Sequence, residues 1–244
     1  MVYLPTMTKT SIVDIKQSTP TSHLDIDANL TQYFDDYFRD LSRERKRIAT
    51  HDTALFIESN LPLVESTLDR FETLNVAVES ANTKGIWMEL GVADGNTINH
   101  IAKFYKGAEK IYGLDSLKGL PSKWRSGFPG GAFSRKNPPK LSENVEFVEG
   151  LFGESLPSIL EKDKRTISFL HIDCDLYEST KSVFDLISDR VCQGTVFVFD
   201  EFFNYPGWRE HEYRAFDEFI KSTNKSFEYL CYTRNHCQVA VKFV

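Results

Sequence analysis

The sequence predicts an α/β fold in which a mostly parallel sheet of seven strands is packed between helices and preceded by a helical extension. Three observations predict it. Beyond Gly85, short apolar runs alternate with helical stretches, which is the pattern of a parallel sheet buried on both faces. A short polar turn separates the last two apolar runs. Before Gly85, apolar residues recur at helical spacing instead.

The composition excludes several classes of protein. The 244 residues include 29 Lys and Arg against 35 Asp and Glu, a net charge of −6. This acidity argues against nucleic acid as a partner, because affinity for phosphates comes from clustered basic side chains. With 41% hydrophobic and 13% aromatic residues, the chain is too apolar for intrinsic disorder. No apolar run approaches the roughly 20 residues that a membrane span needs, so no membrane partner is expected.

The N-terminus and the cysteines indicate a cytoplasmic protein. The first 20 residues lack the basic and then apolar pattern of a secretory signal. The four cysteines show no Cys-x-x-Cys spacing, so reduced thiols are expected. They are Cys174, Cys192, Cys231 and Cys237. A disulfide between Cys231 and Cys237 across a hairpin is the alternative.

The chain is expected to divide into three regions. Residues 1–25 are rich in Thr, Ser and Lys and are predicted to form a flexible arm. Residues 26–84 are predicted to form a helical extension, because Tyr33, Tyr37 and Leu41 recur at four-residue spacing. This extension is expected to act as a lid or to make dimer contacts, and a homodimer is therefore an expected assembly. Residues 85–244 are expected to form the main domain.

The apolar runs of the main domain place its elements. Strands are predicted at residues 86–90, 111–114, 145–148, 167–172, 195–199, 227–232 and 238–243. Helices are predicted near residues 97–105, 156–161, 179–188 and 210–222. The turn at residues 233–237 is too short for a parallel crossover, so the last two strands must be antiparallel. The sheet should therefore contain one reversed strand near its edge.

A glycine-containing turn follows the first predicted strand. Gly91 and Gly95 permit a tight turn and close approach of a ligand to the backbone, and a helix is expected to begin near Thr97. The second strand ends at Asp115, where an acid is placed to accept hydrogen bonds from two ribose hydroxyls. Ligands bind beyond the carboxyl ends of strands in such sheets, so the two features indicate a nucleoside site.

Two nucleoside ligands fit such a site. An NAD site would carry a Gly-x-Gly-x-x-Gly turn against a pyrophosphate, but here the third glycine is displaced and Glu89 precedes the turn. Carboxylates at this place would repel a pyrophosphate, whereas they suit the ammonium and sulfonium groups of S-adenosylmethionine (SAM). SAM is therefore the predicted cofactor, and an NAD-dependent dehydrogenase is an alternative. The candidate contact residues here are Glu89, Gly91, Ala93, Gly95, Asn96, Thr97, Asp115 and Ser116.

Acidic side chains follow the fourth and fifth predicted strands. Asp173 ends the fourth strand, and Asp200 and Glu201 end the fifth, so all three fall on the same edge of the sheet. Carboxylates this close raise one another's pKa unless a cation compensates them. Mg²⁺ suits a few carboxylates and retained waters, and it would lower the pKa of a substrate hydroxyl. Alternatively, Asp175 is only a helix cap and Glu201 a solvated loop acid.

Two histidines and two loops lie near this edge. His171 lies within an apolar strand and is expected to be a core histidine, whereas His211, at a junction of loop and helix, is a candidate base or substrate contact. The loops at residues 119–133 and 203–209 combine glycines with aromatic side chains, as covers over a substrate do. Alternatively, these aromatic side chains pack against the N-terminal helices or a second subunit.

Four motifs of the main domain form a recognisable set. They are Glu89-x-Gly91-x-x-x-Gly95, Asp115-Ser116-x-x-Gly119-Leu120-Pro121, Asp173-x-Asp175-Leu176-Tyr177-x-Ser179-Thr180 and Asp200-Glu201. As a set they resemble class I SAM-dependent methyltransferases with a Rossmann-like sheet. The most similar group is the macrocin O-methyltransferase family of metal-dependent sugar O-methyltransferases. The resemblance covers roughly residues 85–244.

The resemblance implies a role for each motif. The glycine turn would face the methionine part of SAM, Asp115 would face the ribose, and Mg²⁺ would bind between the acidic strand ends. Asp175 would be the general base, with His211 as the other candidate. The implied reaction is methylation of a small-molecule hydroxyl on a sugar or natural product. The implied adenine contacts are Gly150, Leu151 and Phe152, and the implied metal ligands are Asp173, which would also lie near SAM, Asp200 and Glu201.

Two departures from the family's pattern concern the acidic motifs. The family usually has Asp-Asp where this chain has Asp200-Glu201, and Gly where this chain has Cys174. Two further alternatives also stay open. One is a metal-independent SAM methyltransferase with another kind of acceptor, and the other is a SAM-binding domain without catalysis.

Overall fold

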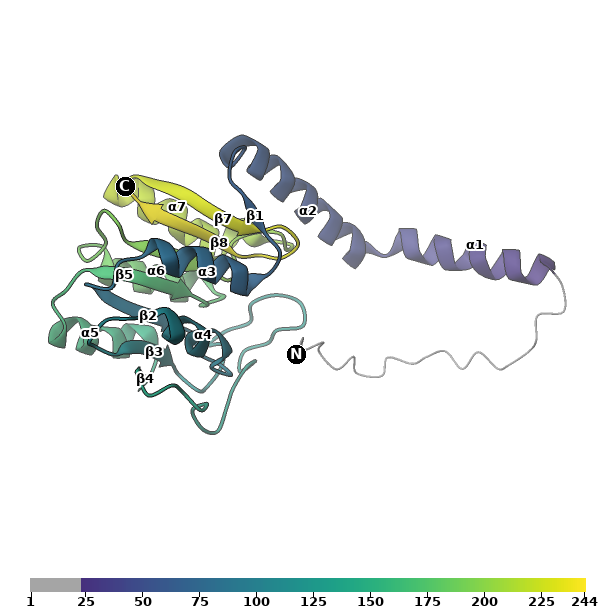
Figure 1. Cartoon of the computed structure of the whole chain (residues 1–244). Coiled ribbons are helices and arrows are strands. Elements are labelled where there is room, and N and C mark those ends of the chain that lie inside the picture. The colour runs from purple at the N-terminus through teal and green to yellow at the C-terminus, as the bar shows by residue number, and fades with distance from the viewer. Residues whose placement is uncertain (1–22) are drawn as a thin grey trace. The chain divides into compact units, whose positions relative to one another are not determined.

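The computed structural model describes residues 23–244, with side chains from residue 28 onward (Figure 1). The described residues fall into two compact units, one that ends at residue 45 and one that spans residues 46–244, and each is described by itself. Of the flexible arm predicted at residues 1–25, residues 1–22 lie outside the described part of the chain. No helix of the described part is long and apolar enough to cross a membrane.

The N-terminal unit is helical. It contains α1 (His23–Arg39) and the first turn of α2 (Leu41–Asn60). Asp40 lies between the two helices and caps α2, because its side chain accepts hydrogen bonds from two amides of the first turn. The four-residue spacing of apolar residues therefore predicted helix α1 correctly. Its aromatic side chains contact one another along the helix and are Tyr33, Phe34, Tyr37 and Phe38.

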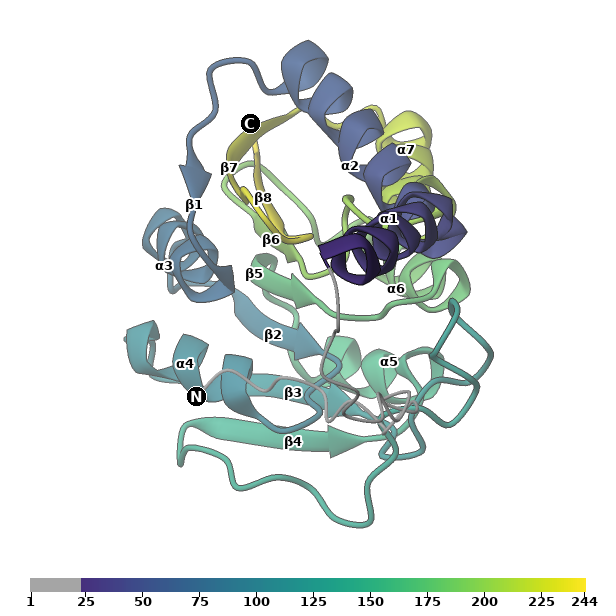
Figure 2. The ribbon, with the colours of Figure 1, turned by 90° about the vertical axis from the view of Figure 1, so that its right-hand side faces the viewer.

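The second unit is built on an eight-stranded sheet (Figure 2). Its strands are β1 (Ser66–Thr67), β2 (Ile86–Leu90), β3 (Ile111–Asp115), β4 (Val145–Glu149), β5 (Ile167–Ile172), β6 (Val196–Phe199), β7 (Phe227–Thr233) and β8 (Val239–Phe243). In space they follow the order β1-β7-β8-β6-β5-β2-β3-β4. β8 is antiparallel to both of its neighbours, and every other pair is parallel. The predicted mostly parallel sheet with one reversed strand is confirmed.

The eighth strand, β1, is an addition to the seven that were predicted. Its residues Ser66 and Thr67 pair with the end of β7. The Thr67 hydroxyl lies 2.6 Å from that of Thr73, which in turn lies 2.8 Å from the hydroxyl of Thr233. Hydroxyl contacts rather than an apolar run thus hold this strand, so hydrophobic periodicity could not have indicated it.

Helices cover both faces of the sheet (Figures 1 and 2). One face carries α3 (Arg70–Ser80) and α4 (Asn96–Phe104), and the other carries α5 (Phe152–Lys162), α6 (Tyr177–Ile187) and α7 (Glu212–Thr223), with the 3-10 helix η1 (Trp208–Glu210) before α7. α3 packs against β6, β7 and β8. We expected the main domain to begin at residue 85, but because of this packing α3 belongs to the compact unit that begins at residue 46.

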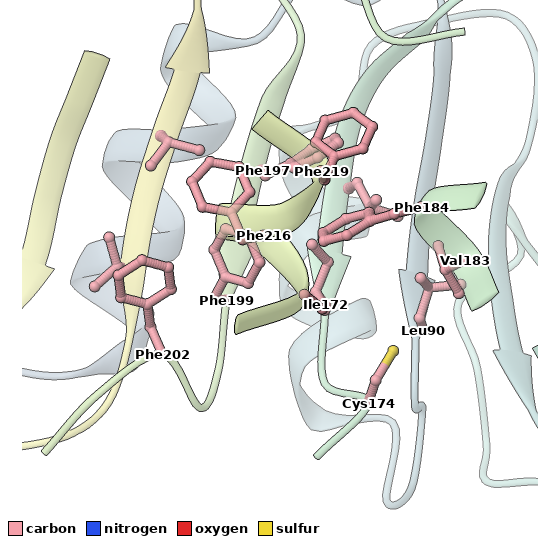
Figure 3. Packing of buried hydrophobic residues seen from close by; sticks show 14 of the residues in the cluster. Leu90, Ile172, Cys174, Val183, Phe184, Phe197, Phe199, Phe202, Phe216 and Phe219 are labelled. Carbon is pink, nitrogen blue, oxygen red and sulfur yellow. The ribbon is translucent and has the colours of Figure 1, made fainter. Parts of the chain in front are cut away.

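Successive strand residues alternate between two apolar clusters, one on each face. In β6, Val196 and Val198 join the cluster under α3 and α4, whereas Phe197 and Phe199 join the cluster under α5, α6 and α7. The second cluster is rich in phenylalanine, and the ring of Phe184 from α6 stacks on that of Phe197 with centroids 5.8 Å apart (Figure 3). Apolar packing therefore covers both faces of the sheet.

The cysteines are not bridged in the structure. All four are free thiols, and three of them are buried. The disulfide considered between Cys231 and Cys237 is therefore wrong. Cys231 lies within β7 and its sulfur contacts the carbonyl oxygen of Thr73, not the other thiol.

Candidate active site

The carboxyl ends of the parallel strands meet at one edge of the sheet, and backbone hydrogen bonds continue beyond them. The amide of Asp173 donates to the carbonyl oxygen of Leu90, and the amide of Asp200 donates to that of Ile172, both at 2.9 Å. The loops that follow β5 and β6 therefore leave the sheet from fixed positions. Both loops begin with an acidic residue.

Asp115 joins the two features predicted for a nucleoside site. Its Oδ2 accepts hydrogen bonds from the amides of Val92 at 3.0 Å and Ala93 at 2.9 Å, while its Oδ1 accepts one from Leu117 at 2.7 Å. Asp115 thus lies against the glycine turn after β2 and holds its backbone. A carboxylate offers about four acceptor positions, so one stays open for a ligand. A contact with a ribose stays a prediction.

The glycines of this turn are required by its shape. Gly91 has φ +94°, and a Cβ added there would lie 2.1 Å from the carbonyl oxygen of Asp173. Gly95 has φ +74° and precedes the first residue of α4. At Gly91, only glycine can adopt this positive φ and also leave room for the carbonyl oxygen of Asp173. The turn after β2 consequently runs directly against the loop after β5.

The other predicted cofactor residues lie along the same edge. Leu151 is exposed, whereas Thr97 is buried. The amide of Gly150 donates to the carbonyl oxygen of Asp115 at 3.1 Å, which ties the end of β4 to that of β3. Their contacts with a cofactor stay predictions. By element, Asn96 and Thr97 open α4, Ser116 follows β3, and Gly150, Leu151 and Phe152 lead from β4 into α5.

Glu89 is buried and paired with a histidine. It lies opposite His171 on the neighbouring strand, and its Oε2 lies 2.8 Å from His171 Nδ1. The Nε2 of His171 lies 3.8 Å from Asp200, a distance that makes an ion pair but no hydrogen bond. Burial opposes charge on His171, but the two carboxylates outweigh it and raise the pKa of His171 to about 10. The expected core histidine is therefore a cation between two strand-end acids.

Asp200 is the acid with the most cationic surroundings. Its Oδ1 accepts a hydrogen bond from Gln238 at 3.1 Å, and its Oδ2 lies 3.4 Å from the guanidinium of Arg70. Burial alone would raise the pKa of Asp200, but His171 and Arg70 outweigh burial and hold that pKa at about 2. Asp200 is therefore ionised at neutral pH.

The other strand-end acids lack such partners. Burial, together with the neighbouring acids Asp200 and Asp175, raises the pKa of Asp173 well above its ordinary value. Burial and Glu201 raise the pKa of Asp175 to about 8, and burial and Asp200 raise that of Glu201 to about 8, although Arg125 opposes both shifts. The structure thus brings all four predicted acids close enough to interact. Their protons would be displaced by a bound cation.

A fifth carboxylate, Glu212, was missed by the sequence reasoning. It is the first residue of α7 and has no exposed surface. Its Oε1 accepts hydrogen bonds from the amides of Cys174 and Asp175, and its Oε2 accepts one from Glu201. Burial, Asp173 and Asp175 raise the pKa of Glu212 well above its ordinary value. Its donors are backbone amides, which leave no trace in a sequence motif.

An aromatic group with one arginine borders the acids. The guanidinium of Arg125 lies 4.0 Å from the ring centroid of Trp124 and 4.8 Å from that of Tyr205. The ring of His211 lies 6.3 Å from Trp124 and 6.1 Å from Tyr205. Burial lowers the pKa of His211, and its Nδ1 is buried with no hydrogen-bond partner among the described residues. His211 is therefore a neutral imidazole with a free ring nitrogen.

The two predicted cover loops differ from each other. In the loop after β6, Phe203 and Tyr205 are buried, and the ring of Phe56 from α2 lies 5.5 Å from Trp208. This loop is therefore no mobile cover, and the alternative of packing against an N-terminal helix is confirmed for it. The loop between β3 and β4 contains no regular element, and its Phe133 is half exposed.

The acidic edge fits a hard cation, although no metal centre is preformed. Among the described residues, no group of three His, Cys, Asp or Glu side chains has the arrangement of a metal site. The donor set is nevertheless all oxygen, as Mg²⁺ prefers. Glu201 Oε2 is buried with no hydrogen-bond partner in the described part of the chain, and burial together with the neighbouring acids raises the pKa values of Asp173 and Glu201.

The strand order and the site together define a class of protein. A parallel sheet with one reversed strand, a glycine turn after β2 and an acid after β3 are the features expected of a class I methyltransferase. The family described as "Methyltransferase domain" matches residues 88–202, which run from β2 to just beyond β6. Residues 88–202 are therefore similar to a methyltransferase domain, and the protein is a methyltransferase.

Solved structures agree with this fold. The chain is similar to CalS11, a calicheamicin methyltransferase, with 21% identity and a TM-score of 0.56 over 83% of this chain and 93% of that one. An apo structure of CalS11, described as a TDP-rhamnose 3'-O-methyltransferase, has 20% identity and a TM-score of 0.52. The match covers 83% of this chain and 94% of that one. The O-methyltransferase NovP has 22% identity and a TM-score of 0.54. The match covers 71% of this chain and 78% of that one. No curated protein matches the chain.

Proposed function

We propose that this enzyme is a SAM-dependent O-methyltransferase that acts on a hydroxyl of a sugar or natural product. The observation that carries the proposal is the contact between Gly91 and Asp173. It joins the turn held by Asp115 to the acidic loop, so a nucleoside cofactor and an acceptor beside the acids would be neighbours. The O-methyltransferases CalS11 and NovP share this fold, which supports the choice of a hydroxyl acceptor.

We propose further that Mg²⁺ is held by Asp173, Asp200 and Glu201. When bound, Mg²⁺ supplies positive charge that lowers the pKa of a nearby hydroxyl, and SAM supplies an activated methyl group. The residues of the chain contribute position and charge. Asp115 keeps the glycine turn in the shape that a ligand would meet, and His171 fixes Glu89 and Asp200 on neighbouring strands.

Two residues are candidates for the base that removes the hydroxyl proton. His211 is neutral at pH 7 because burial lowers its pKa, and its Nδ1 has no partner among the described residues. Asp175 has a pKa of about 8, raised by burial and by Glu201, so at pH 7 it holds a proton unless a cation lies nearby. His211 is therefore the group already able to accept a proton, and Asp175 becomes one when the acids are compensated.

One observation favours a second candidate, a metal-independent methyltransferase. Arg70 already provides a positive charge 3.4 Å from Asp200, and the side chain of Arg70 is 38% exposed at the acidic edge. In that case Arg70 and Arg125 would supply the compensating charge. The acceptor need then not be a hydroxyl.

The expected partners are part of the proposal. The acceptor would be a small molecule in the cytoplasm, and neither nucleic acid nor membrane would be a partner. A homodimer is also proposed. It is supported by apolar side chains of α1 that are exposed, namely Leu30, Tyr33, Phe34, Tyr37 and Phe38.

The test combines cofactor binding with methyl transfer. Calorimetry with SAM and S-adenosylhomocysteine (SAH) measures binding, and mass spectrometry measures methylation of TDP-rhamnose and a panel of neutral glycosides. We expect EDTA to lower the rate about 100-fold or more and Mg²⁺ to restore it. Asp173→Asn should have the same effect, whereas Asp185→Asn, on an exposed carboxylate of α6, should leave the rate unchanged.

The outcomes separate the candidates. If neither SAM nor SAH binds, the proposal is wrong. Binding without methylation of any acceptor would indicate a SAM-binding domain without catalysis. Full activity in EDTA would establish the metal-independent alternative.

A further inference from the structure

Glu212 is a buried acid that belongs to neither the predicted cofactor residues nor the predicted metal ligands. Its Oε1 lies 3.0 Å from the amide nitrogen of Cys174 and 3.1 Å from that of Asp175, and its Oε2 lies 3.2 Å from that of Glu201. Cys174 and Asp175 belong to the loop after β5, and Glu201 to the loop after β6. One side chain from α7 therefore connects the two loops that carry the strand-end acids.

We infer that Glu212 is a positioning residue that holds these two loops together so that their acids face one cation-binding space. The inference rests on the proposed function, because it assigns the cation site its support. Glu212 itself would touch neither the cation nor the acceptor. Three of the roughly four acceptor positions of its carboxylate are already occupied by the three amides.

The electrostatics of the edge explain why such support is needed. Asp173 and Asp175 lie in the loop after β5 and Glu201 lies in the loop after the neighbouring strand β6, so their carboxylates repel one another across the two loops whenever they are ionised. Buried amides without a partner are also costly. Asp175 adds a third demand, since its φ of +59° lies in the left-handed region. The carboxylate of Glu212 meets all three demands, because it fixes the amides on both sides of the gap.

Glu201 keeps one buried side-chain oxygen without a hydrogen-bond partner among the described residues. Its amide is held by Glu212, yet its own Oε2 is buried with no hydrogen-bond partner among the described residues. An oxygen in this condition is a free ligand position. Glu212 thus holds the backbone of Glu201, while Oε2 of Glu201 keeps no hydrogen-bond partner among the described residues. In metal sites, groups that support the ligands typically change affinity 10–100-fold when replaced.

The test compares Glu212→Gln with Glu210→Gln. The first variant keeps the shape of the side chain but replaces one acceptor oxygen with an NH₂ group, so one of the two loops loses its bond. The second changes an acid two residues earlier whose side chain is 70% exposed, and it is the matched control. Mn²⁺ is the cation probe, measured by electron paramagnetic resonance, and SAH binding is measured by calorimetry.

We expect Glu212→Gln to weaken Mn²⁺ binding about 10–100-fold and to lower kcat, with the Kd of SAH within about twofold of the wild-type value. Amide hydrogen exchange at Cys174, Asp175 and Glu201 should accelerate, while exchange at Leu170 in β5 stays slow. Glu210→Gln should change none of these. Unchanged Mn²⁺ binding and kcat in Glu212→Gln would overturn the inference, even with the proposed function intact.

The wild-type enzyme gives an independent measurement in case Glu212→Gln does not fold. The three amides should be protected from exchange without any cation or cofactor, because Glu212 holds them in the free protein. If these amides exchanged as fast as amides without hydrogen bonds, Glu212 would not hold the two loops together. Wild-type protein that binds no Mn²⁺ while these amides are protected would instead contradict the metal part of the proposed function and, with it, the support of a cation site.

Discussion

At Gly91 the backbone adopts φ +94° and passes so close to the loop after β5 that a Cβ would lie 2.1 Å from the carbonyl oxygen of Asp173. Gly127, in the loop between β3 and β4, has a nearly equal φ of +90° but no atom within 4 Å of an added Cβ. Both glycines would be strained by a side chain, but only at Gly91 would the side chain also meet a neighbouring backbone atom. Any difference between their alanine variants measures the contact alone.

We expect Gly91→Ala to lower the free energy of unfolding by about 3 kcal/mol, of which the strained φ accounts for about 1 kcal/mol. Gly127→Ala should lower the free energy of unfolding only by the contribution of the strained φ, about 1 kcal/mol. In addition, Gly91→Ala should weaken SAH binding more than about tenfold, because the turn must move away from Asp173. Urea unfolding and calorimetry measure the two effects. Equal destabilisation by both variants would show that the close approach has no importance.

Some residues of the candidate site could be predicted from the sequence, and others could not. Asp115, Asp173 and Asp200 directly follow apolar runs, so their common edge could be predicted from strand ends alone. Glu212 could not be found in this way, because it opens a helix and its three donors are backbone amides. The cation on His171 was missed for a related reason. Its charge depends on Glu89 and Asp200, which lie on neighbouring strands.

At the scale of elements, the connection from α5 to β5 is fixed by an ion pair. Asp163 ends α5, and its carboxylate accepts hydrogen bonds from Nε of Arg165 at 3.0 Å and from Nη2 at 2.6 Å. Only 12% of the Asp163 side chain is exposed. The hydrogen bonds from Arg165 lower the pKa of Asp163 below its ordinary value, although burial opposes them. The pair therefore stabilises the folded state only while Asp163 is ionised.

This shift predicts a pH dependence of stability. Because the pKa of Asp163 is lower in the folded state, its contribution is fully present above the unfolded pKa near 4 and is lost as the pH falls through the folded value. We expect Asp163→Asn to lower the free energy of unfolding by about 1 kcal/mol at pH 7 and by less as the pH falls below 4. Asp189→Asn, on a carboxylate that is 77% exposed, is the control. A difference independent of pH would contradict the ion-pair explanation.

Elements could be predicted where burial gave them a pattern. All seven predicted strands exist, because each contains apolar residues that pack in the sheet, although β4 and β7 are only partly buried. β1 was missed because it is two residues long and held by threonine hydroxyls. α3 was predicted as a helix but assigned to an extension, since its packing against β6, β7 and β8 joins residues that are far apart in the sequence. Pairing across the sheet is set by contacts that no local pattern contains.

The whole molecule depends on a sheet that is buried on both sides. Leu170 lies in β5, at the centre of the strand order, and pairs with Met88 on one side and Phe197 on the other. All three are buried and belong to the phenylalanine-rich cluster, in which Figure 3 labels Phe197. The same strand carries Asp173 at its carboxyl end. The position of the candidate site is therefore coupled to the packing of the core beneath it.

We expect Leu170→Ala to lower the free energy of unfolding by about 3–5 kcal/mol, because a cavity in a sheet held by helices on both faces cannot collapse. Leu63→Ala makes the same change at a side chain that is 95% exposed, and it should cost less than about 0.5 kcal/mol. Urea unfolding with an unchanged m-value measures both. Because Leu170 lies three residues before Asp173, its variant should also weaken Mn²⁺ binding, whereas Leu63→Ala should not. A Leu170→Ala protein with wild-type stability would mean that the two faces are not packed as a single core.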